Sequence, residues 1–587
     1  MLKKFFISML GTMAGLWISL ALLIFGGIMF VGALIGSKGD SSANVEKKSV
    51  LHFNLTGEIA ERYQPISFFD MIQMGESDAP TLEEMISALK AAAKDEKIEG
   101  LYLECNGSSM GTASRQELIE AIVEFKRNRK WVYAYSDSYS QGDYLIATTA
   151  DTLALNPIGS VDIHGVGGMV PFYKGLLDKI GVKMQIIKVG TYKSAVEPYI
   201  LTSMSEPARK QMQQYCDTIW NYISQTIAAN RQLPESEVRN LASQMIFTRP
   251  ADTFTADGLV DTLQYSRQAN ATLVAMSGID RKDPRLITPR DYLDSKNILP
   301  TLGDDARHIA VLYAVGEISD SGDEGIVGST MVKEINDLAD DDDVAGLVLR
   351  VNSPGGSAFA SEQIWEALEY FKSKDKPFYV SMGDYAASGG YYISCGADSI
   401  FADRTTITGS IGVFGMIPDF SGLLKDKLGV NFSTVETNEN ALGISISEPM
   451  TPAQYQAMQQ NVENTYALFT SRVATGRNLE LDFVKGIAEG RVWIGSDAIQ
   501  LGLVDALGSL DAAVGAMADE LGMLKSETKS YPAVEEKMWE QFLRDNADFQ
   551  ILEDAGYDKE AMRYIYDVRK LRSANPLQAR MPKVIIK

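Results

Sequence analysis

Apolar residues along this chain gather in short runs that alternate with longer stretches of mixed apolar and polar residues. Gly346–Leu349 and Ser399–Ala402 have the pattern of buried strands, and His308–Leu312 is a third β-like run. Longer stretches such as Ser361–Phe371 space their apolar residues as a helix does. Strands that alternate with helices predict an α/β protein with largely parallel sheets.

The N-terminus departs from this alternation. Residues Phe5–Ile35 contain no charged side chain, and this stretch exceeds the roughly 20 apolar residues that cross a bilayer. It is also too long for the apolar region of a simple signal peptide, so we expect an uncleaved transmembrane helix within residues 1–36. A cleaved signal peptide is the alternative, because Gly32–Ser37 contains small residues. Lysines on both sides of the segment leave its orientation open.

The rest of the chain repeats itself. Leu55–Ile59 resembles Ala314–Ile318, and identical residues recur at a shift of 247 positions when Gly142–Leu177 is laid against Gly389–Leu424. This self-similarity indicates two copies of one domain in tandem. The predicted organisation is an anchor at residues 1–36, a polar linker at 37–50, a first repeat at 51–263, a connector at 264–307, a second repeat at 308–523 and a C-terminal extension at 524–587.

Composition narrows the chemistry. With 587 residues, 45% of them hydrophobic, the chain can build more than one core. A net charge of -22 excludes nucleic acid as a partner, because its phosphates would be repelled. The three cysteines and three histidines show no CxxC or HExxH spacing, so we expect neither a metal site nor a cofactor. Since His52 and His308 both sit at strand starts, a serine nucleophile would first be matched with a lysine or carboxylate base.

The differences between the two copies point to such a pair. Ser410 lies among three glycines in Thr405–Gly415, and glycine permits positive φ and close approach of a substrate chain. Ser410 falls opposite Ile163 of the first copy, whereas Lys193 of the first copy falls opposite Ala441 of the second. Each copy therefore holds one member of a serine and lysine pair.

Four motifs in combination resemble the signal peptide peptidase A family in its long, duplicated, bacterial membrane form. They are Tyr192–Pro198, Arg350–Ser357, Ala386–Tyr392 and Thr408–Gly412. The resemblance covers the chain from the anchor to about residue 523. It implies tandem ClpP/crotonase-like domains and a serine peptidase, with a lysine general base, that cuts signal peptides left in the membrane. Carried onto this sequence, it implies Ser410 as the nucleophile and Lys193 as the base.

A lysine base must be neutral. An exposed lysine has a pKa of roughly 10.4 and is protonated at neutral pH, so Lys193 must be desolvated or kept away from carboxylates. Its neighbours between Val189 and Val196 are mostly uncharged, which permits burial, although Glu197 offers an unwelcome counterion. We expect Lys193 to be neutral in the working site.

The oxyanion of the reaction needs hydrogen-bond donors. Asn352–Ser357 lies between a predicted strand and a predicted helix, where glycine amides point freely outward. Resemblance to ClpP-like proteases implies Gly355, with Gly356, as the donors, and a plain glycine turn is the alternative. Ser388 is a rival nucleophile, because the catalytic serine of ClpP lies in a motif that resembles Ala386–Gly390.

A peptidase of this kind would take extended apolar peptides by pairing them with strand edges. The resemblance also implies a homo-oligomer, a homotetramer, in the cytoplasmic (inner) membrane of a bacterium, single-pass, with the repeats on the extracytoplasmic side. Two other interpretations are a crotonase-like acyl-CoA enzyme and a membrane-tethered scaffold with vestigial catalysis. The first gives no reason for the anchor or for the split pair, and retention of both Ser410 and Lys193 speaks against the second.

Overall fold

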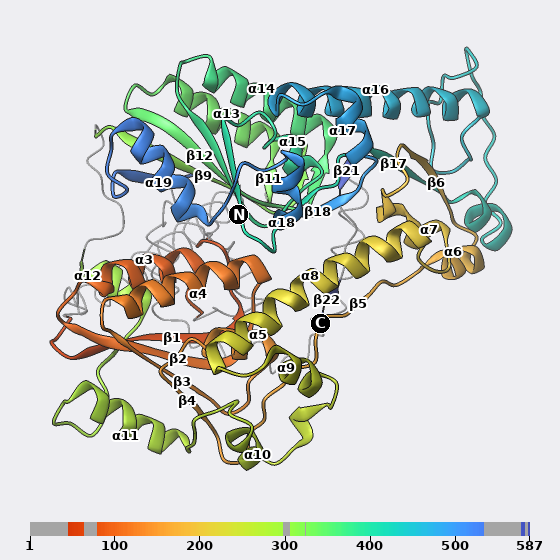
Figure 1. The fold of residues 1–587 in the computed structure, drawn as a ribbon. Coiled ribbons are helices and arrows are strands. Elements are labelled where there is room, and N and C mark those ends of the chain that lie inside the picture. Colours follow the sequence, from red (N-terminus) through yellow and green to blue (C-terminus); the bar gives the residue numbers. More distant parts are fainter. Residues whose placement is uncertain are drawn as a thin grey trace, which may run out of the picture.

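The computed structural model describes residues 45–63, 79–296, 306–322, 324–532, 577–580 and 585–586. Figure 1 shows two α/β bodies that lie against each other, one for each predicted repeat. The predicted anchor lies outside the described residues. Among the helices that are described, none combines the length and the apolar character needed to cross a membrane.

The first body is built on a six-stranded parallel sheet in the order β7-β4-β3-β2-β1-β8. Helices α3 and α4 cover the face of this sheet that is turned toward the other body, and α11 covers the opposite face (Figure 1). The strands are β1 (Ser49–Glu58), β2 (Ile98–Ser109), β3 (Trp131–Ser136), β4 (Thr152–Leu155), β7 (Thr262–Leu263) and β8 (Leu286–Ile287). The main helices are α3 (Leu82–Ala93), α4 (Thr112–Arg127), α5 (Gln141–Ala147), α8 (Glu206–Arg231), α11 (Ser266–Ser277) and α12 (Pro289–Ser295).

The second body repeats this plan. Its sheet runs in the order β18-β16-β14-β12-β9-β20, with β15 paired to β14 and β19 paired to β15. Among its described strands, only β18 is antiparallel to its neighbour. The strands are β9 (His308–Val315), β12 (Val344–Ser353), β14 (Phe378–Ala387), β15 (Ser399–Ala402), β16 (Ile407–Gly409), β18 (Val492–Ile494), β19 (Ala506–Leu507) and β20 (Thr528–Tyr531). The main helices are α13 (Gly328–Asp340), α14 (Ala358–Lys372), α15 (Gly389–Tyr392), α16 (Pro452–Gly476), α17 (Leu481–Ile487) and α19 (Leu510–Leu521).

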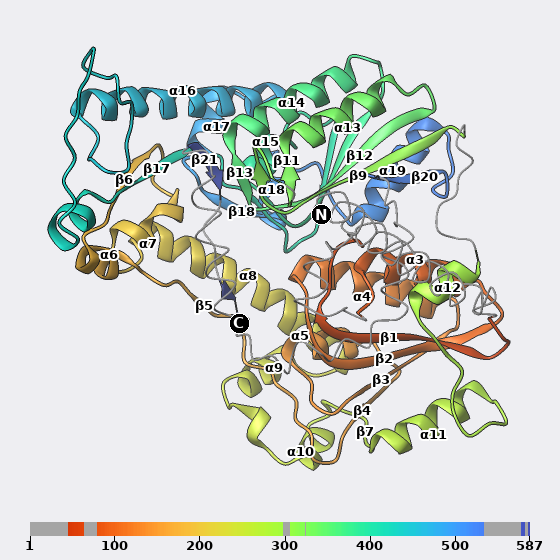
Figure 2. The ribbon, with the colours of Figure 1, turned by 180° about the vertical axis from the view of Figure 1, so that it is seen from behind.

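A third sheet joins the two bodies, in the order β11-β10-β13-β21-β17-β6. Strand β6 (Lys183–Lys188) of the first repeat pairs antiparallel with β17 (Phe414–Asp419) of the second, and the two run side by side in both views (Figures 1 and 2). The remaining strands are β10 (Ile318–Ser319), β11 (Ile326–Val327), β13 (Gly355–Ser357) and β21 (Leu577–Arg580). This sheet carries the segment that follows β6, and with it Lys193, to the second repeat.

Parts of the predicted connector and of the predicted extension belong to the two bodies. The predicted connector supplies α11 and β8 to the first body, and β8 pairs with β1. The extension supplies β20, which pairs with β9 in the corresponding place of the second body. A short strand β22 (Ile585–Ile586) also pairs with β5 (Gly168–Met169) of the first repeat.

The two bodies share apolar packing where they meet. Ala387 and Ile407, at the ends of β14 and β16, belong to the buried cluster that forms the core of the first repeat. Ala387 directly precedes Ser388, and Ile407 opens the short strand that Ser410 follows. The contact between the repeats therefore lies next to the candidate site.

Candidate active site

Lys193 is buried completely between the two repeats. It follows β6, where Val189 N donates to Val413 O (3.3 Å) and Tyr192 N donates to Glu489 O (3.0 Å). Gly490 closes over the lysine stem with a φ of +76°, and a Cβ at that position would lie 2.7 Å from Lys193 Cβ. The second repeat therefore wraps the lysine of the first, and the close approach requires glycine at position 490.

The lysine amine contacts both candidate serines of the same chain. Lys193 Nζ lies 2.7 Å from Ser388 Oγ, 3.1 Å from Ser410 Oγ and 3.1 Å from Ser410 O. Glu197, the carboxylate nearest in sequence, is engaged elsewhere and accepts from Ser205 N (3.0 Å) and Ser205 Oγ (2.6 Å). Burial alone lowers the pKa of Lys193 well below its ordinary value. The amine is therefore suited to be neutral and to act as a base.

The hydrogen bonds around Lys193 distinguish the two serines. A neutral amine offers two N–H donors and one lone pair. Ser410 O can only accept, and Ser410 Oγ lies 3.4 Å from Gly490 O, to which it donates. Both contacts from Lys193 to Ser410 therefore use N–H groups, and the lone pair is left for the Ser388 hydroxyl proton. The geometry thus favours Ser388, the rival nucleophile of the sequence analysis, over Ser410.

The backbone around Ser388 supports the same assignment. Ser388 lies at the turn between β14 and α15, with φ +58° and ψ -113°. Its N–H donates to Gly409 O (2.8 Å). A strained strand-to-helix turn presents the nucleophile in many serine hydrolases. Ser410 also has a positive φ, of +51°. It lies in the loop after β16 and not at a strand-to-helix turn, and its own N–H donates to Arg491 O (2.7 Å).

The glycines predicted for the oxyanion lie beside Ser388. Gly355 has a φ of +97°, and a Cβ on Gly356 would lie 1.9 Å from Ile318 O, so neither position tolerates a side chain. A Cβ on Gly389 would lie 3.2 Å from Gly356 N, which places β13 against the turn that carries Ser388. The Gly355 N–H donates to Ser353 Oγ (3.2 Å) in this structure.

In the third sheet, the slot between β13 and β17 is one strand wide. Strand β21 of the C-terminal extension lies in this slot, antiparallel to β13 on one side and to β17 on the other. Gly356 stands opposite Ala579 in this pairing, and Phe414 stands opposite Gln578. Backbone pairing on both sides is the arrangement by which an extended peptide binds to strand edges.

The histidines take no part in the site. His52 Nε2 lies 2.8 Å from Glu104 Oε2, His308 Nε2 lies 2.8 Å from the Tyr531 hydroxyl, and His164 Nδ1 lies 3.0 Å from Asp162 Oδ2. Within the described part of the chain, no group of three or more histidine, cysteine, aspartate or glutamate side chains is placed to hold a metal ion. The catalytic chemistry available here is that of a buried amine and two hydroxyls.

Comparison with known proteins agrees with this chemistry. The family model described as Peptidase family S49 matches residues 124–280 and 370–524, one segment in each repeat. "Protease 4" of Haemophilus influenzae is 36% identical over 542 residues, which is 89% of this chain and 86% of the relative. "Protease 4" of Salmonella typhi is 36% identical over 503 residues, 83% of this chain and 77% of the relative. "Putative signal peptide peptidase SppA" of Enterococcus faecium is 35% identical over 229 residues, 38% of this chain and 64% of the relative.

These matches favour the peptidase over the acyl-CoA enzyme and the vestigial scaffold. They span both repeats, and the structure brings Lys193 of one repeat against two serines of the other. The chain belongs to peptidase family S49 and is a serine protease that hydrolyses peptide bonds.

Proposed function

We propose that this chain is an endopeptidase in which Ser388 is the nucleophile, Lys193 is the general base and the Ser410 hydroxyl holds the lysine in place. The observation that carries the proposal is the 2.7 Å contact between Lys193 Nζ and Ser388 Oγ in a fully buried setting. It revises the sequence-based assignment of Ser410 as the nucleophile.

The reaction follows from these positions. The Ser388 hydroxyl proton passes to Lys193 Nζ while Ser388 Oγ attacks the scissile carbonyl carbon. Amides of the glycine strand β13, with Gly355 and Gly356 as the candidates, stabilise the oxyanion. The Lys193 ammonium returns its proton to the leaving amine, and the acyl-enzyme forms. Lys193 then takes a proton from water, whose oxygen attacks the acyl carbon. The Lys193 ammonium gives this proton to Ser388 Oγ as it leaves, which releases the carboxylic acid and restores the free serine and the neutral lysine.

The substrates we propose are extended apolar peptides, above all cleaved signal peptides in the membrane. The slot between β13 and β17 supports an extended substrate. An open pocket of about 490 Å³ lies beside the Lys193 segment, and Ile200, Leu201 and Pro207 offer an apolar side chain one part of its wall. The charged residues Lys188, Glu197 and Glu489 also line this pocket. The uncharged stretch Phe5–Ile35 supports a single-pass anchor. Its place in the bacterial inner membrane, with the repeats on the extracytoplasmic side, is proposed from the family resemblance. A homotetramer is part of this proposal, from the family resemblance.

The test is to map the site of a serine-directed fluorophosphonate in the full-length protein and in three variants. We expect the label on Ser388, and we expect Ser388→Ala to lose both the label and peptide hydrolysis, by about 10⁴-fold or more. Lys193→Ala should abolish labelling, whereas Ser410→Ala should keep the label on Ser388 at a reduced rate. Label on Ser410 in the wild type would return the nucleophile to that residue.

A second measurement addresses the substrate. The full-length protein in vesicles should cleave a synthetic signal peptide and leave a tightly folded soluble protein intact, because only an extended chain fits the slot. Equal cleavage of both substrates would contradict the proposed specificity and leave the peptidase assignment unaffected.

A further inference from the structure

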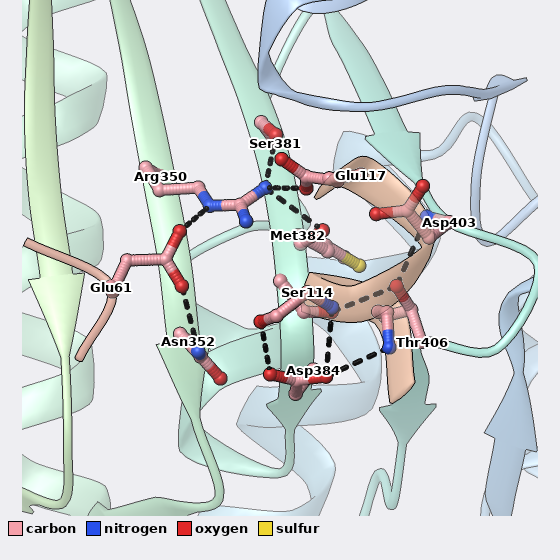
Figure 3. A network of polar contacts seen from close by, with 12 residues as sticks. Glu61, Ser114, Glu117, Arg350, Asn352, Ser381, Met382, Asp384, Asp403 and Thr406 are labelled. Atoms are coloured by element: carbon pink, nitrogen blue, oxygen red, sulfur yellow. Dashed lines mark hydrogen bonds and ion pairs between the residues drawn. The ribbon is translucent and has the colours of Figure 1, made fainter. Parts of the chain in front are cut away.

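A buried cluster of charged side chains joins the two repeats (Figure 3). Arg350 of β12 is completely buried, with Nε 2.6 Å from Glu61 Oε1 and Nη1 2.7 Å from Glu117 Oε1. Glu61 follows β1 and Glu117 lies in α4, so both carboxylates belong to the first repeat. A buried guanidinium held by two carboxylates is costly to separate, because each group would be left as an unpaired buried charge.

Other contacts cross the same interface. Asp384 of β14 accepts from Ala113 N (2.9 Å) and Ser114 N (3.1 Å) at the start of α4, and also from the Ser114 hydroxyl. Asn352 Nδ2 donates to Glu61 Oε2 (2.9 Å). In Figure 3 these side chains converge from β12, β14 and the segments of the first repeat.

Asp403 connects a third strand to the cluster. Its buried carboxyl lies near Glu117 (Figure 3), and burial raises the pKa of both groups. Asp403 N also donates to Thr406 Oγ1 (3.0 Å), which itself donates to Gly383 O of β14 (2.8 Å). Asp403 and Thr406 lead directly into β16.

Each of the three strands held in this way ends at one part of the site. Strand β12 runs into Gly355, β14 into Ser388 and β16 into Ser410. The first repeat, whose side chains contact these strands, also supplies Lys193. A displacement between the repeats at the cluster therefore changes the distance from the lysine to the serines.

The duplicated sequence shows that the shared fold does not require this arginine. At the shift of 246 positions that aligns β2 with β12, the counterpart of Arg350 is Glu104, a residue of opposite charge. Glu104 pairs with His52 of its own repeat and its side chain is 33% exposed. Arg350 is thus a feature of the repeat that carries the serines.

We propose that Arg350 is a positioning residue for the reaction: its ion pairs with Glu61 and Glu117 set the place of Lys193, in one repeat, against Ser388, in the other. This inference rests on the proposed function in one respect, that Lys193 is the base. Displacement of a catalytic group by about 1 Å costs roughly 10²-fold in rate, so a small change in docking would be measurable.

The experiment uses the full-length protein with Arg350→Met. We expect kcat to fall about 10²-fold with KM nearly unchanged, and the labelling of Ser388 to slow equally. The pH midpoint of labelling should move upward, because looser docking admits water to Lys193 Nζ. Arg350→Lys should recover part of the rate, since a lysine restores the charge but cannot span both carboxylates.

The matched control is Arg472→Met. Arg472 Nη2 pairs with Glu362 at 2.6 Å within the second repeat, so the variant loses an ion pair without touching the contact between repeats. Its pH midpoint of labelling should match that of the wild type.

The outcome that would overturn the proposal is an Arg350→Met protein that melts earlier but, while folded, labels at the wild-type rate and midpoint. The Ser388 and Lys193 mechanism would survive that result. If Arg350→Met does not fold, the same labelling measurements are made on Glu117→Gln. This variant removes one of the two ion pairs and keeps the side-chain volume. A slower rate with a raised midpoint supports the proposal, and wild-type behaviour overturns it.

Discussion

At the scale of single residues, the proposed mechanism depends on one buried amine. Because burial lowers the pKa of Lys193, the amine is neutral at pH values where an exposed lysine is charged. Lowering the pH through that depressed pKa adds a proton and removes the base. We expect the labelling of Ser388 and kcat/KM to rise with pH in one step, with a midpoint well below roughly 10.4, and then to level off. A rate that is constant over the accessible pH range would contradict a neutral lysine base.

The same burial has a consequence for stability. Between the depressed pKa of folded Lys193 and roughly 10.4 in the unfolded chain, the unfolded state binds more protons, so stability falls as the pH is lowered through this window. Lys193→Met removes that cost. We expect a higher melting temperature at neutral pH together with a loss of about 10²- to 10⁴-fold in activity. A lower melting temperature would mean that the hydrogen bonds of the amine outweigh its desolvation.

Gly490 tests how tightly the site is packed. Alanine there would bring a Cβ to 2.7 Å from Lys193 Cβ at a φ of +76°, so we expect Gly490→Ala to displace the lysine and to lower kcat by about 10²-fold. Gly486→Ala, in α17, is the matched control, because a Cβ there has no atom within 4 Å. It should keep full activity and gain roughly 0.5–1 kcal/mol in stability. Equal activity of the two variants would show that the lysine has room to move.

The sequence predicts part of this site. Lys193 can be found because one copy has it and the other has Ala441. Ser388 and Ser410 cannot be separated from the sequence, because both lie in glycine-rich motifs and the choice depends on which hydroxyl faces the lysine lone pair. The pairing of Arg350 with Glu61 is also invisible, since the partners are 289 positions apart and no motif marks Glu61.

At the scale of elements, the pattern of apolar residues predicted strands and helices that form from neighbouring residues. The apolar runs at His308–Leu312 and Ser399–Ala402 lie in β9 and β15, and Ser361–Phe371 lies in α14. Pro289 opens α12 at its first position, where proline is favoured. The third sheet was not predicted, because pairing between β6 and β17 joins different repeats and is decided by their docking.

Strand β21 occupies the slot that a substrate would use, which gives a prediction. A chain ended after residue 576 lacks β21, whereas a chain ended after residue 580 keeps it. Since an internal strand competes with substrate for the same edges, we expect the shorter chain to have a several-fold higher kcat/KM for extended peptides. The longer chain serves as the control, because it lacks β22 but retains the competitor. Equal values for the two chains would mean that β21 leaves the slot freely or binds alongside the substrate.

At the scale of the whole molecule, the two repeats have divided one site between them. The first repeat contributes Lys193, and the second contributes Ser388, Ser410 and the glycine strand, all within one chain. Duplication permits this division, because each copy needs to keep only its own half once the two are docked. The buried contacts of Arg350 and the shared apolar packing at Ala387 and Ile407 hold the halves together.

A division within one chain differs measurably from a division between chains. In the proposed homotetramer, Lys193→Ala and Ser388→Ala chains with different tags can be expressed and purified together. Such a mixed assembly would contain intact lysines and intact serines, but never in the same chain. Because Lys193 reaches Ser388 of its own chain at 2.7 Å, we expect neither peptide hydrolysis nor fluorophosphonate labelling of the Lys193→Ala chain. Wild type co-purified with Lys193→Ala should stay active in proportion to its share, which controls for damage by assembly. Label on Ser388 of the Lys193→Ala chain would show that a neighbouring chain supplies the lysine and that the two halves exchange between copies.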